Sequence, residues 1–470
     1  MAQLTVEEYL SALDGELIWG TPVDCGGVFT DSRRPLPAGL FLALIGERFD
    51  GHDYIEAAGR AGALGAIVDR RRQQKAIQQA VNLAEHHSQP LFLMAVSDTL
   101  EALHKLANAH RRKFTGPVIA ITGSNGKTST KEMTAHCLRT QYKVLATERN
   151  YNNEVGLPLT LLGLTPEHNI CVVEMGMRGL GQIARLAAVA EPNIGVITNI
   201  GPVHLELLGD IDNVAAAKSE LIQALSPSGV AVLNGDDDKA AAMAKQAKGT
   251  VITYGISHNC RLQARNIELH PSESTFQVWF DGEKVTDVLL SLPGEHNVYN
   301  ALAALAAVLS IGGDLPVAAA TLATMAPLPM RLERTALPSG TVLINDAYNA
   351  SPTSMQVALD VLSRSEGRRV AVLGDMLELG VDSQAQHHEV GRLAVTAGVQ
   401  QLVVVGKGGK AIAQGALAAG LSPEAIQHYP TAAAASAAID NWLHSGDCVL
   451  VKASRGVRLE QVAEAVIRKR

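Results

Sequence analysis

The sequence predicts an α/β protein of three domains. Short apolar strands alternate with helix-compatible segments along most of the chain, a pattern typical of mainly parallel sheets with helices on both faces. The 470 residues are enough for about three domains of ordinary size. A polar stretch at residues 109–116 and a proline-marked segment at residues 326–330 interrupt the alternation. We therefore expect domains at residues 1–112, 113–329 and 330–470.

The second and third domains are predicted strand by strand. In the second domain the strand at residues 118–122 is followed by strands at 170–174, 194–199 and 230–234. Three later segments, at residues 251–254, 274–280 and 288–292, look like an antiparallel extension of this parallel sheet. The third domain alternates strands at residues 342–345, 369–374, 401–405 and 448–451 with helices. This alternation is typical of a Rossmann-like unit.

Composition excludes several other classes of protein. Hydrophobic residues make up 47% of the chain and charged residues 19%, which suits buried α/β domains and argues against disorder. A formal charge of −7 with 4% aromatic residues offers neither a basic face nor a stacking platform for nucleic acid. The compact basic run Arg70-Arg71-Arg72 is expected to be a solvated patch. The five cysteines are too scattered to indicate disulfides or a zinc site.

Targeting features also point in one direction. No apolar run approaches the ~18 residues of a membrane span, and the first residues lack the basic start and apolar core of a signal peptide. We therefore expect a cytoplasmic protein without a membrane span.

A glycine-rich turn in the second domain predicts a nucleotide triphosphate site. Gly123 and Gly126 let backbone N–H groups face phosphate, and the helix that follows adds the positive end of its dipole. Lys127 can reach the β- and γ-phosphates, and the Thr128 hydroxyl can hold magnesium. A bare Gly-Lys-Thr is usually an ordinary strand-to-helix connection, but the flanking strand and helix favour ATP or GTP here. The predicted nucleotide-binding residues of this turn are Gly123, Ser124, Asn125, Gly126, Lys127, Thr128 and Ser129.

The turn is a shortened P-loop, and five further segments follow it in order. The general P-loop has a glycine five residues before Gly126, where this chain has Ile121. Taken together, these features resemble the ATP-dependent Mur ligases of bacterial cell-wall synthesis, and the resemblance covers essentially the whole chain. The five segments are Asn150-Tyr-Asn-Asn-Glu-Val-Gly-Leu-Pro158, Glu174-Met-Gly176, Thr198-Asn-Ile-Gly-Pro-Val-His204, Ala217-Lys218-Ser-Glu220 and Leu292-Pro-Gly-Glu-His-Asn-Val-Tyr-Asn300.

Within that family, two segments of the third domain resemble the branch that adds D-alanyl-D-alanine to UDP-N-acetylmuramoyl-tripeptide. They are Asp346-Ala-Tyr-Asn-Ala-Ser-Pro352 and Gly374-Asp-Met-Leu-Glu-Leu-Gly380. The branch that adds the third amino acid usually shows Asp-Tyr-Ala-His-Thr-Pro and Asp-Asn-Pro, and neither occurs in this chain. The resemblance thus implies a ligase that forms an amide bond through an acyl phosphate.

The first domain carries two segments similar to the uridine-nucleotide domain of those two branches. They are Phe29-Thr-Asp-Ser-Arg33 and Gly46-Glu-Arg-Phe-Asp-Gly-His-Asp53. The resemblance implies substrate contacts from Ser32 and Arg48, and from Asn152 and Asn153 in the second domain. Ile45 stands where relatives often have lysine, so a basic contact to the substrate diphosphate is either lost or supplied by another residue.

The resemblance also implies two magnesium ions held by Thr128, Glu174, His204 and Lys218, with Lys127 completing the catalytic set. Glu174 ends an apolar strand, where a carboxylate can hold magnesium. Taken alone, Glu174 would be a solvated turn residue and His204 a structural histidine. Lys218 lies in a helical run, where a lysine is ordinarily a surface charge. In the family this lysine reacts with carbon dioxide, so we expect Lys218 to be a carbamate.

The remaining nucleotide contacts are implied to come from two domains. Asn297 and Asn300 open a helix and are expected at the adenine, although helix capping is the alternative from the residues alone. From the third domain, Arg331 is expected at the phosphates and Asp346 at the ribose. Tyr348 either lines the same pocket or is a core aromatic residue.

The end of the third domain offers a site for the dipeptide carboxylate. Lys452, Ser454 and Arg455 follow the last strand of the Rossmann-like unit. A solvated basic turn is the alternative for this segment.

Two other functions remain open from the sequence. A folylpolyglutamate synthase shares a similar P-loop and ligase chemistry but lacks a uridine-nucleotide domain like residues 1–112. A nucleotide-dependent switch would hydrolyse ATP without forming a bond. We expect a monomer that binds small-molecule substrates and no nucleic acid.

Overall fold

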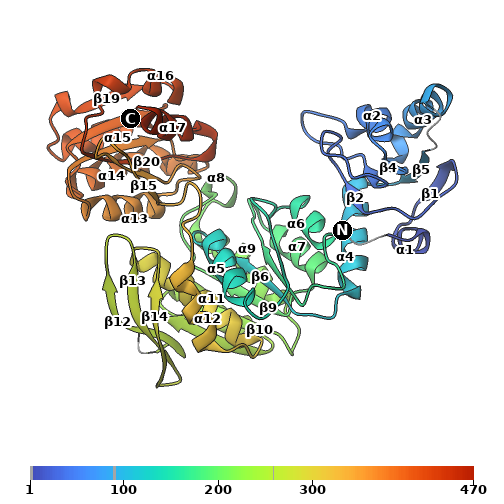
Figure 1. Cartoon of the computed structure of the whole chain (residues 1–470), viewed down its shortest axis with the longest axis horizontal. Coiled ribbons are helices and arrows are strands. Elements are labelled where there is room, and N and C mark those ends of the chain that lie inside the picture. Colours follow the sequence, from blue (N-terminus) through green and yellow to red (C-terminus); the bar gives the residue numbers. More distant parts are fainter. Residues whose placement is uncertain (1–3, 88–90, 258, 470) are drawn as a thin grey trace.

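The computed structural model describes residues 4–87, 91–257 and 259–469. Residues 1–3, which open the segment used above to judge the signal peptide, lie outside them. The described residues form three sheets of five, nine and six strands, which confirms the predicted α/β class. Figure 1 shows the first and third sheets standing on opposite sides of the second.

The first sheet packs helices on both of its faces. Its strand order is β1-β5-β4-β3-β2, and only β1 runs antiparallel to its neighbour. Helices α2 and α3 cover one face, while α1 and α4 cover the other. The strands and helices are β1 (Glu16–Trp19), β2 (Val28–Phe29), β3 (Leu40–Leu42), β4 (Gly65–Asp69), β5 (Phe92–Val96), α1 (Val6–Ala12), η1 (Gly51–Tyr54), α2 (Ile55–Arg60), η2 (Arg70–Arg72), α3 (Gln73–His87) and α4 (Thr99–Lys113).

The second sheet is the largest and carries the P-loop. Helices α5 and α11 cover one face, and α6, α7 and α9 cover the other. Its strands are β6 (Val118–Thr122), β7 (Val144–Ala146), β8 (Ile170–Glu174), β9 (Ile194–Ile197), β10 (Val230–Asn234), β11 (Thr250–Gly255), β12 (Leu262–Leu269), β13 (Ser274–Phe280) and β14 (Glu283–Leu290). Its helices are α5 (Lys127–Leu138), α6 (Gly156–Leu161), α7 (Gln182–Ala190), α8 (Leu205–Leu208), α9 (Ile211–Ala224), α10 (Asp238–Ala242), η3 (Met243–Gln246), α11 (Glu295–Ser310), α12 (Leu315–Thr321) and η4 (Leu322–Thr324).

The order of this sheet, β14-β13-β12-β11-β10-β9-β6-β8-β7, corrects one expectation. The segment 251–254 was expected in the antiparallel extension, but β11 runs parallel to both β10 and β12. Strands β11 and β12 overlap at only two residue pairs, so the short connection 256–261 is enough to join them. Antiparallel pairing begins one strand later, between β12, β13 and β14.

The third sheet has the order β15-β16-β20-β17-β18-β19, and only β15 is antiparallel to its neighbour. Helices α13, α14 and α15 cover one face, and α16 and α17 cover the other, as in the predicted Rossmann-like unit. The elements are β15 (Glu333–Ala336), β16 (Val342–Asn345), α13 (Pro352–Ser363), β17 (Arg368–Gly374), η5 (Gly380–Asp382), α14 (Ser383–Thr396), β18 (Gln401–Val405), α15 (Gly409–Ala418), η6 (Pro423–Ala425), β19 (Ile426–Tyr429), α16 (Ala432–Ala437), η7 (Ile439–Asn441), β20 (Asp447–Lys452), η8 (Arg455–Val457) and α17 (Glu460–Arg468).

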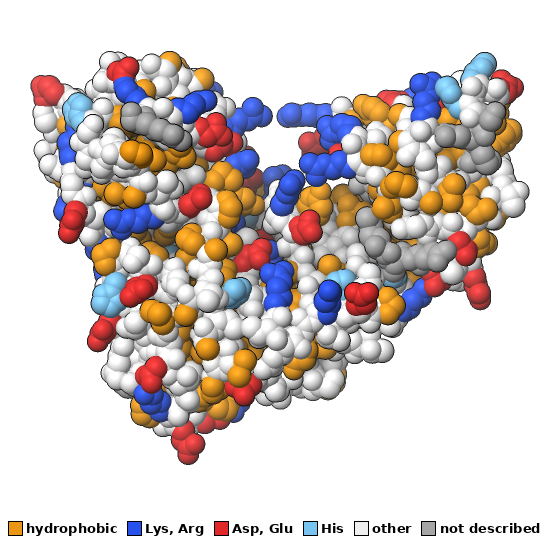
Figure 2. Space-filling model, in the orientation of Figure 1, with side chains coloured by type: hydrophobic (Ala, Val, Ile, Leu, Met, Phe, Trp, Pro, Cys, Tyr) orange, Lys and Arg blue, Asp and Glu red, His pale blue; other side chains and the backbone are white. Residues whose placement is uncertain are grey.

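The surface between the first and third sheets is deeply hollowed. Figure 2 shows this hollow in the space-filling view, with Lys and Arg side chains on both of its walls. Within the described part of the chain, no helix is both long and apolar enough to cross a membrane. All five cysteines are buried free thiols.

Candidate functional site

The site begins where three neighbouring strands of the second sheet end. Strands β9, β6 and β8 are parallel neighbours, so their carboxyl ends meet at one edge of the sheet. The P-loop follows β6, Glu174 is the last residue of β8, and His204 follows β9. The topology therefore gathers three segments that are far apart in the sequence.

The two glycines of the P-loop are required by close packing. Gly123 and Gly126 have φ angles of 150° and 80°, a region that L side chains rarely adopt. A Cβ atom on Gly123 would lie 1.8 Å from the Thr198 hydroxyl, and one on Gly126 would lie 2.4 Å from Asn300 Oδ1. The loop between them is fixed as well, because the Asn125 N–H donates to Asn199 Oδ1 at 2.9 Å.

The remaining P-loop residues lie at the start of α5 or bond to the neighbouring strand end. The Ser124 hydroxyl donates to the carbonyl of Gly201 at 3.0 Å and accepts from its N–H at 2.8 Å. Ser129 lies in the first turn of α5, which begins at Lys127.

Lys127 rests on the carbonyls of its own loop. Its ammonium donates to the carbonyls of Gly123 at 2.7 Å and Ser124 at 3.0 Å. Burial lowers the pKa of Lys127, and the nearby charge of Arg331 lowers it further while Glu174 opposes the shift. The cation is thus held beside the turn where phosphate is predicted to bind.

Thr128 and Glu174 form a pair of oxygen donors next to the P-loop. The Thr128 hydroxyl donates to Glu174 Oε2 at 2.8 Å, and Asn152 Nδ2 donates to Oε1 at 2.6 Å. Arg331 reaches in from the third domain and donates to the Thr128 hydroxyl at 2.8 Å. Asn153 serves locally, since its Oδ1 accepts from the N–H of Gly156 at the start of α6.

Lys218 is buried, not on the surface. It lies on α9, 2% exposed, and its amine donates to the Gly123 carbonyl at 2.9 Å. Burial lowers the pKa of Lys218 well below its ordinary value, and the charge of Lys127 adds to the shift. A surface-charge role for Lys218 is therefore wrong, and burial favours the neutral form of its amine.

His204 lies at the N-terminus of α8 and faces the same cluster. Its Nδ1 is 2.5 Å from Oε2 of Glu378, which comes from the third domain. Burial lowers the pKa of His204, Glu378 opposes this shift, and the charges of Lys127 and Lys218 reinforce it. These interactions place His204 near both lysines.

Asn297 and Asn300 both lie in α11 and face the P-loop side of the sheet. Asn300 Oδ1 accepts from the Thr130 hydroxyl at 3.3 Å, and Asn300 Nδ2 donates to Asn297 Oδ1 at 3.3 Å. The N-cap of α11 is Gly294, without a side-chain capping bond. The capping alternative is therefore wrong for both asparagines.

The third domain contributes a second group of buried charges. The Lys452 ammonium donates to Asp346 Oδ2 at 2.5 Å and to the Asn349 carbonyl at 2.9 Å. Burial raises the pKa of Asp346, which Lys452 opposes. The solvated-turn alternative is therefore wrong for Lys452, because its ammonium is buried and already paired.

The two polar residues that follow Lys452 differ from each other in exposure. Ser454 is buried, and its hydroxyl accepts from the Leu377 N–H at 2.9 Å. Arg455 is exposed, and its guanidinium lies 3.4 Å from Glu460.

Arg331 stacks over the half-buried ring of Tyr348, with 4.2 Å between the guanidinium carbon and the ring centroid. This arrangement favours a fixed position for the arginine side chain.

Ser32 and Arg48 belong to the first domain, whose sheet stands apart from the P-loop sheet in Figure 1. Arg48 is exposed at the tip of a tight turn closed by the bridge between Ile45 and Asp50. Ile45 is also exposed, at 46%.

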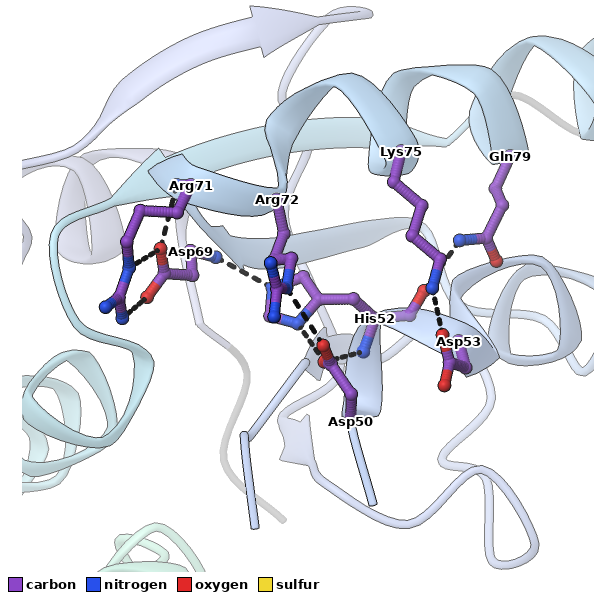
Figure 3. Close-up of polar contacts among 8 residues, drawn as sticks. All are labelled: Asp50, His52, Asp53, Asp69, Arg71, Arg72, Lys75 and Gln79. Atoms are coloured by element: carbon purple, nitrogen blue, oxygen red, sulfur yellow. Dashed lines mark hydrogen bonds and ion pairs between the residues drawn. The ribbon is translucent and has the colours of Figure 1, made fainter. Parts of the chain in front are cut away.

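The base of that turn is fixed by a buried histidine that the motif analysis did not single out. His52 is fully buried, its Nδ1 lies 2.6 Å from Asp50 Oδ1, and its Nε2 accepts from the Asp69 N–H at 2.8 Å (Figure 3). Because Nε2 accepts, Nδ1 carries the proton and donates to Asp50. The segment Gly51-His-Asp53 resembles the uridine-nucleotide domain, but the sequence alone does not indicate that its histidine is buried.

The basic run on η2 completes the network in Figure 3. Arg72 Nε donates to Asp50 at 3.0 Å, and Arg71 forms a two-bonded pair with Asp69 that lowers the pKa of Asp69. A cavity of about 600 Å³ is lined by Asp50, Asp53, Arg70, Arg71, Arg72, Gln73, Gln74 and Lys75. The run is partly solvated, as predicted, but it also ties α3 to the turn that carries Arg48.

We predict that His52→Ala lowers the free energy of unfolding by about 2–4 kcal/mol, because two buried hydrogen bonds are lost and a cavity is left. Urea denaturation of the full chain measures the change. Arg60→Ala is the control, at an exposed residue of α2 that pairs with Glu56, and it is expected to change this free energy by less than about 1 kcal/mol. Equal effects of the two substitutions would contradict the structural role of His52.

Known proteins resemble this chain over most of its length. Three family models match the chain: "Mur ligase family, catalytic domain" at residues 25–111, "Mur ligase middle domain" at 121–308 and "Mur ligase, glutamate ligase domain" at 330–455. A Bacillus subtilis protein named UDP-N-acetylmuramoyl-tripeptide--D-alanyl-D-alanine ligase is 38% identical, covering 94% of this chain and 93% of its own length.

Solved structures give the same result. A crystal structure of MurF from Acinetobacter baumannii has a TM-score of 0.88 and 31% identity, and covers 100% of this chain and 99% of its own. MurF ligase from Thermotoga maritima in complex with ADP has a TM-score of 0.79 and 28% identity over 94% of this chain and 97% of its own. The chain belongs to the Mur ligase family.

Proposed function

We propose that this chain is an ATP-dependent ligase that joins D-alanyl-D-alanine to UDP-N-acetylmuramoyl-tripeptide, releasing ADP and phosphate. One observation carries the proposal: beside the P-loop the Thr128 hydroxyl bonds to both Glu174 and Arg331. Lys127 lies on the carbonyls of the same loop. The Bacillus subtilis relative, which matches nearly the full length of the chain, is named for this reaction. The folylpolyglutamate synthase alternative is not favoured by these relatives.

The first step forms an acyl phosphate from a carboxylate that is otherwise inert to amines. An oxygen of the tripeptide's terminal carboxylate attacks the γ-phosphorus of ATP, the bond to the β,γ-bridging oxygen breaks, and ADP leaves with that electron pair. Lys127 and Arg331 supply positive charge where negative charge gathers on the phosphoryl group. The Lys127 ammonium exchanges its loop carbonyls for phosphate oxygens in this step.

The donor set fits magnesium, which prefers oxygen ligands and keeps several waters. Thr128 and Glu174 offer two such oxygens 2.8 Å apart. No three His, Cys, Asp or Glu side chains gather at one point among the described residues. The proposed ligands include only two residues of those types, Glu174 and His204. Bound magnesium would neutralise phosphate charge and bring the two anionic substrates together.

Lys218 completes the set of oxygen donors once it is modified. Its neutral amine nitrogen adds to the carbon of carbon dioxide, a C–N bond forms, and one proton is released to water, which leaves a carbamate of single negative charge. The carbamate nitrogen retains one N–H, so the bond to the Gly123 carbonyl can persist. Burial favours this chemistry because only the neutral amine is nucleophilic.

The second step forms the amide bond. The amine nitrogen of D-alanyl-D-alanine attacks the acyl carbon and loses one proton to water. The bond between the acyl carbon and the phosphate oxygen then breaks, and phosphate leaves the tetrahedral intermediate with that electron pair. Contacts between the second and third domains, such as the Ser351 hydroxyl donating to Asn125 Oδ1 at 3.0 Å, shield the acyl phosphate from water. We assign the dipeptide carboxylate to Ser454 and the exposed Arg455, with Lys452 supporting Asp346 at the ribose.

The other proposed roles follow the three-domain division. Residues 1–112 hold the uridine nucleotide through Ser32 and Arg48, residues 113–329 hold ATP, and residues 330–470 complete its site. Asn152 contacts the tripeptide end of the substrate, and Asn297 and Asn300 contact the adenine. A hinge lies near residues 327–331. The reaction is the last cytoplasmic step in making the peptidoglycan precursor, on which cell shape and division depend, and the enzyme acts as a monomer.

The test is whether phosphate release depends on both substrates. We expect release from ATP and magnesium to require UDP-N-acetylmuramoyl-tripeptide together with D-alanyl-D-alanine, with mass spectrometry showing the joined product. A folate with glutamate serves as the competing substrate pair. ATP hydrolysis that proceeds equally fast with neither substrate would favour a nucleotide switch instead.

A further inference from the structure

The Glu378 side chain crosses from the third domain to the second. Its Oε2 lies 2.5 Å from His204 Nδ1, and its Oε1 lies 3.6 Å from Arg178 Nε. Arg178 follows β8 and His204 follows β9, the strands on either side of β6. One carboxylate of the third domain therefore contacts two strand ends that flank the P-loop.

The backbone at this contact is shaped for docking. His204 and Glu378 have φ angles of 56° and 63°, and such conformations in residues other than glycine cluster at functional sites. Gly380, also at φ 63°, packs so closely that a Cβ atom would lie 3.3 Å from the Glu206 backbone. The Glu206 N–H also donates to the Glu378 carbonyl at 3.4 Å. The turn at residues 378–380 thus fits against α8.

The chemistry of the pair is that of an oriented metal ligand. A histidine that donates one ring N–H to a carboxylate has its tautomer and ring orientation fixed, and its other nitrogen gains basicity toward a metal. With Nδ1–H donating to Glu378, the Nε2 of His204 holds the free lone pair.

We propose that Glu378 is a positioning residue that orients His204 for metal binding, and that it does so only while the third domain is docked. This inference rests on the proposed function, because it takes His204 as a magnesium ligand. Docking of the third domain and completion of the second metal site then become one event. With the third domain undocked, the site formed by Thr128 and Glu174 alone would remain.

Manganese is a direct probe, because electron paramagnetic resonance counts free Mn²⁺ in the presence of ADP and needs no turnover. For the wild type we expect two bound ions. Glu378→Ala is expected to lower the affinity for the second ion by about 10–100-fold and to leave the affinity for the first ion unchanged. Glu378→Gln keeps an acceptor for Nδ1–H, so its affinity for the second ion is expected to lie between those of the wild type and Glu378→Ala.

Two variants serve as controls, with circular dichroism to confirm folding. Arg178→Gln removes the ion pair between Arg178 and Glu378 but leaves the hydrogen bond between His204 and Glu378. Glu366→Gln makes the same carboxylate-to-amide change at an exposed position of the third domain. Both are expected to bind the second ion within about threefold of the wild type, well inside the loss expected for a removed metal-orienting partner.

Several results would overturn the proposal. If Glu378→Ala binds the second Mn²⁺ as tightly as the wild type does, Glu378 does not orient His204. Tighter binding would mean that Glu378 competes with the metal for His204. A glutamine variant as weak as the alanine variant would make charge, and not orientation, the cause. A wild type that forms the joined product but binds only one Mn²⁺ would overturn this inference and leave the proposed ligase function intact.

Discussion

Replacing Lys127 by alanine is expected to lower turnover by about 100-fold or more, because one preorganised cation is removed from the developing phosphoryl charge. The fold should survive, since among the described residues the Lys127 ammonium bonds to carbonyls of its own loop. Lys245→Ala, an exposed lysine of the same domain, is the matched control. Steady-state phosphate release by the three proteins measures the effect.

A folded Lys127→Ala variant with near-normal turnover would remove the P-loop from the mechanism. Circular dichroism and thermal unfolding distinguish this result from misfolding. The binding of ADP, measured separately, shows whether the loss lies in affinity or in the chemical step.

Removing carbon dioxide from the enzyme and its buffer is expected to abolish most activity, and bicarbonate is expected to restore it. The reason is that the proposed carbamate would supply an anion beside the proposed magnesium ligands, and burial lowers the pKa of Lys218, which favours the reactive neutral amine. Lys218→Ala should lose about 100-fold or more in turnover and fail to respond to bicarbonate. Short carboxylic acids added to this variant should recover part of its activity by replacing the carbamate.

Carbon-labelled bicarbonate allows the carbamate to be observed directly by nuclear magnetic resonance. The carbamate signal should be present in the wild type and absent from Lys218→Ala. A density map of the active, nucleotide-bound enzyme that shows an unmodified Lys218 amine would contradict the hypothesis.

Much of the fold could be predicted because its signals are local. Alternating strands and helices identify the α/β class, and the strand at residues 118–122 with its glycine turn locates the P-loop. The pairing of β11 could not be predicted, because it depends on how far two strands overlap, and a strand segment carries no such information. Strands β11 and β12 overlap at two residue pairs, and this short overlap allows them to run parallel.

The site was harder to predict wherever burial decides the role. A lysine in a helical run is ordinarily exposed, yet Lys218 is buried against the Gly123 carbonyl because α9 packs on the sheet directly under the P-loop. Lys452 and Asp346 are 106 positions apart in the sequence and pair only because β16 and β20 are neighbours. The contact between His204 and Glu378 likewise depends on how two domains dock, which motif spacing does not report.

Positional isotope exchange in ATP tests most directly whether the carboxylate is activated first. Reversible cleavage of the bond between the β,γ-bridging oxygen and the γ-phosphorus lets a label in the bridge exchange with other oxygens of the β-phosphate. We expect this scrambling to require UDP-N-acetylmuramoyl-tripeptide and magnesium, to proceed without D-alanyl-D-alanine, and to vanish in Lys127→Ala. Scrambling that is equally fast without the UDP-tripeptide would show that the carboxylate is not the acceptor, which would contradict the ligase mechanism.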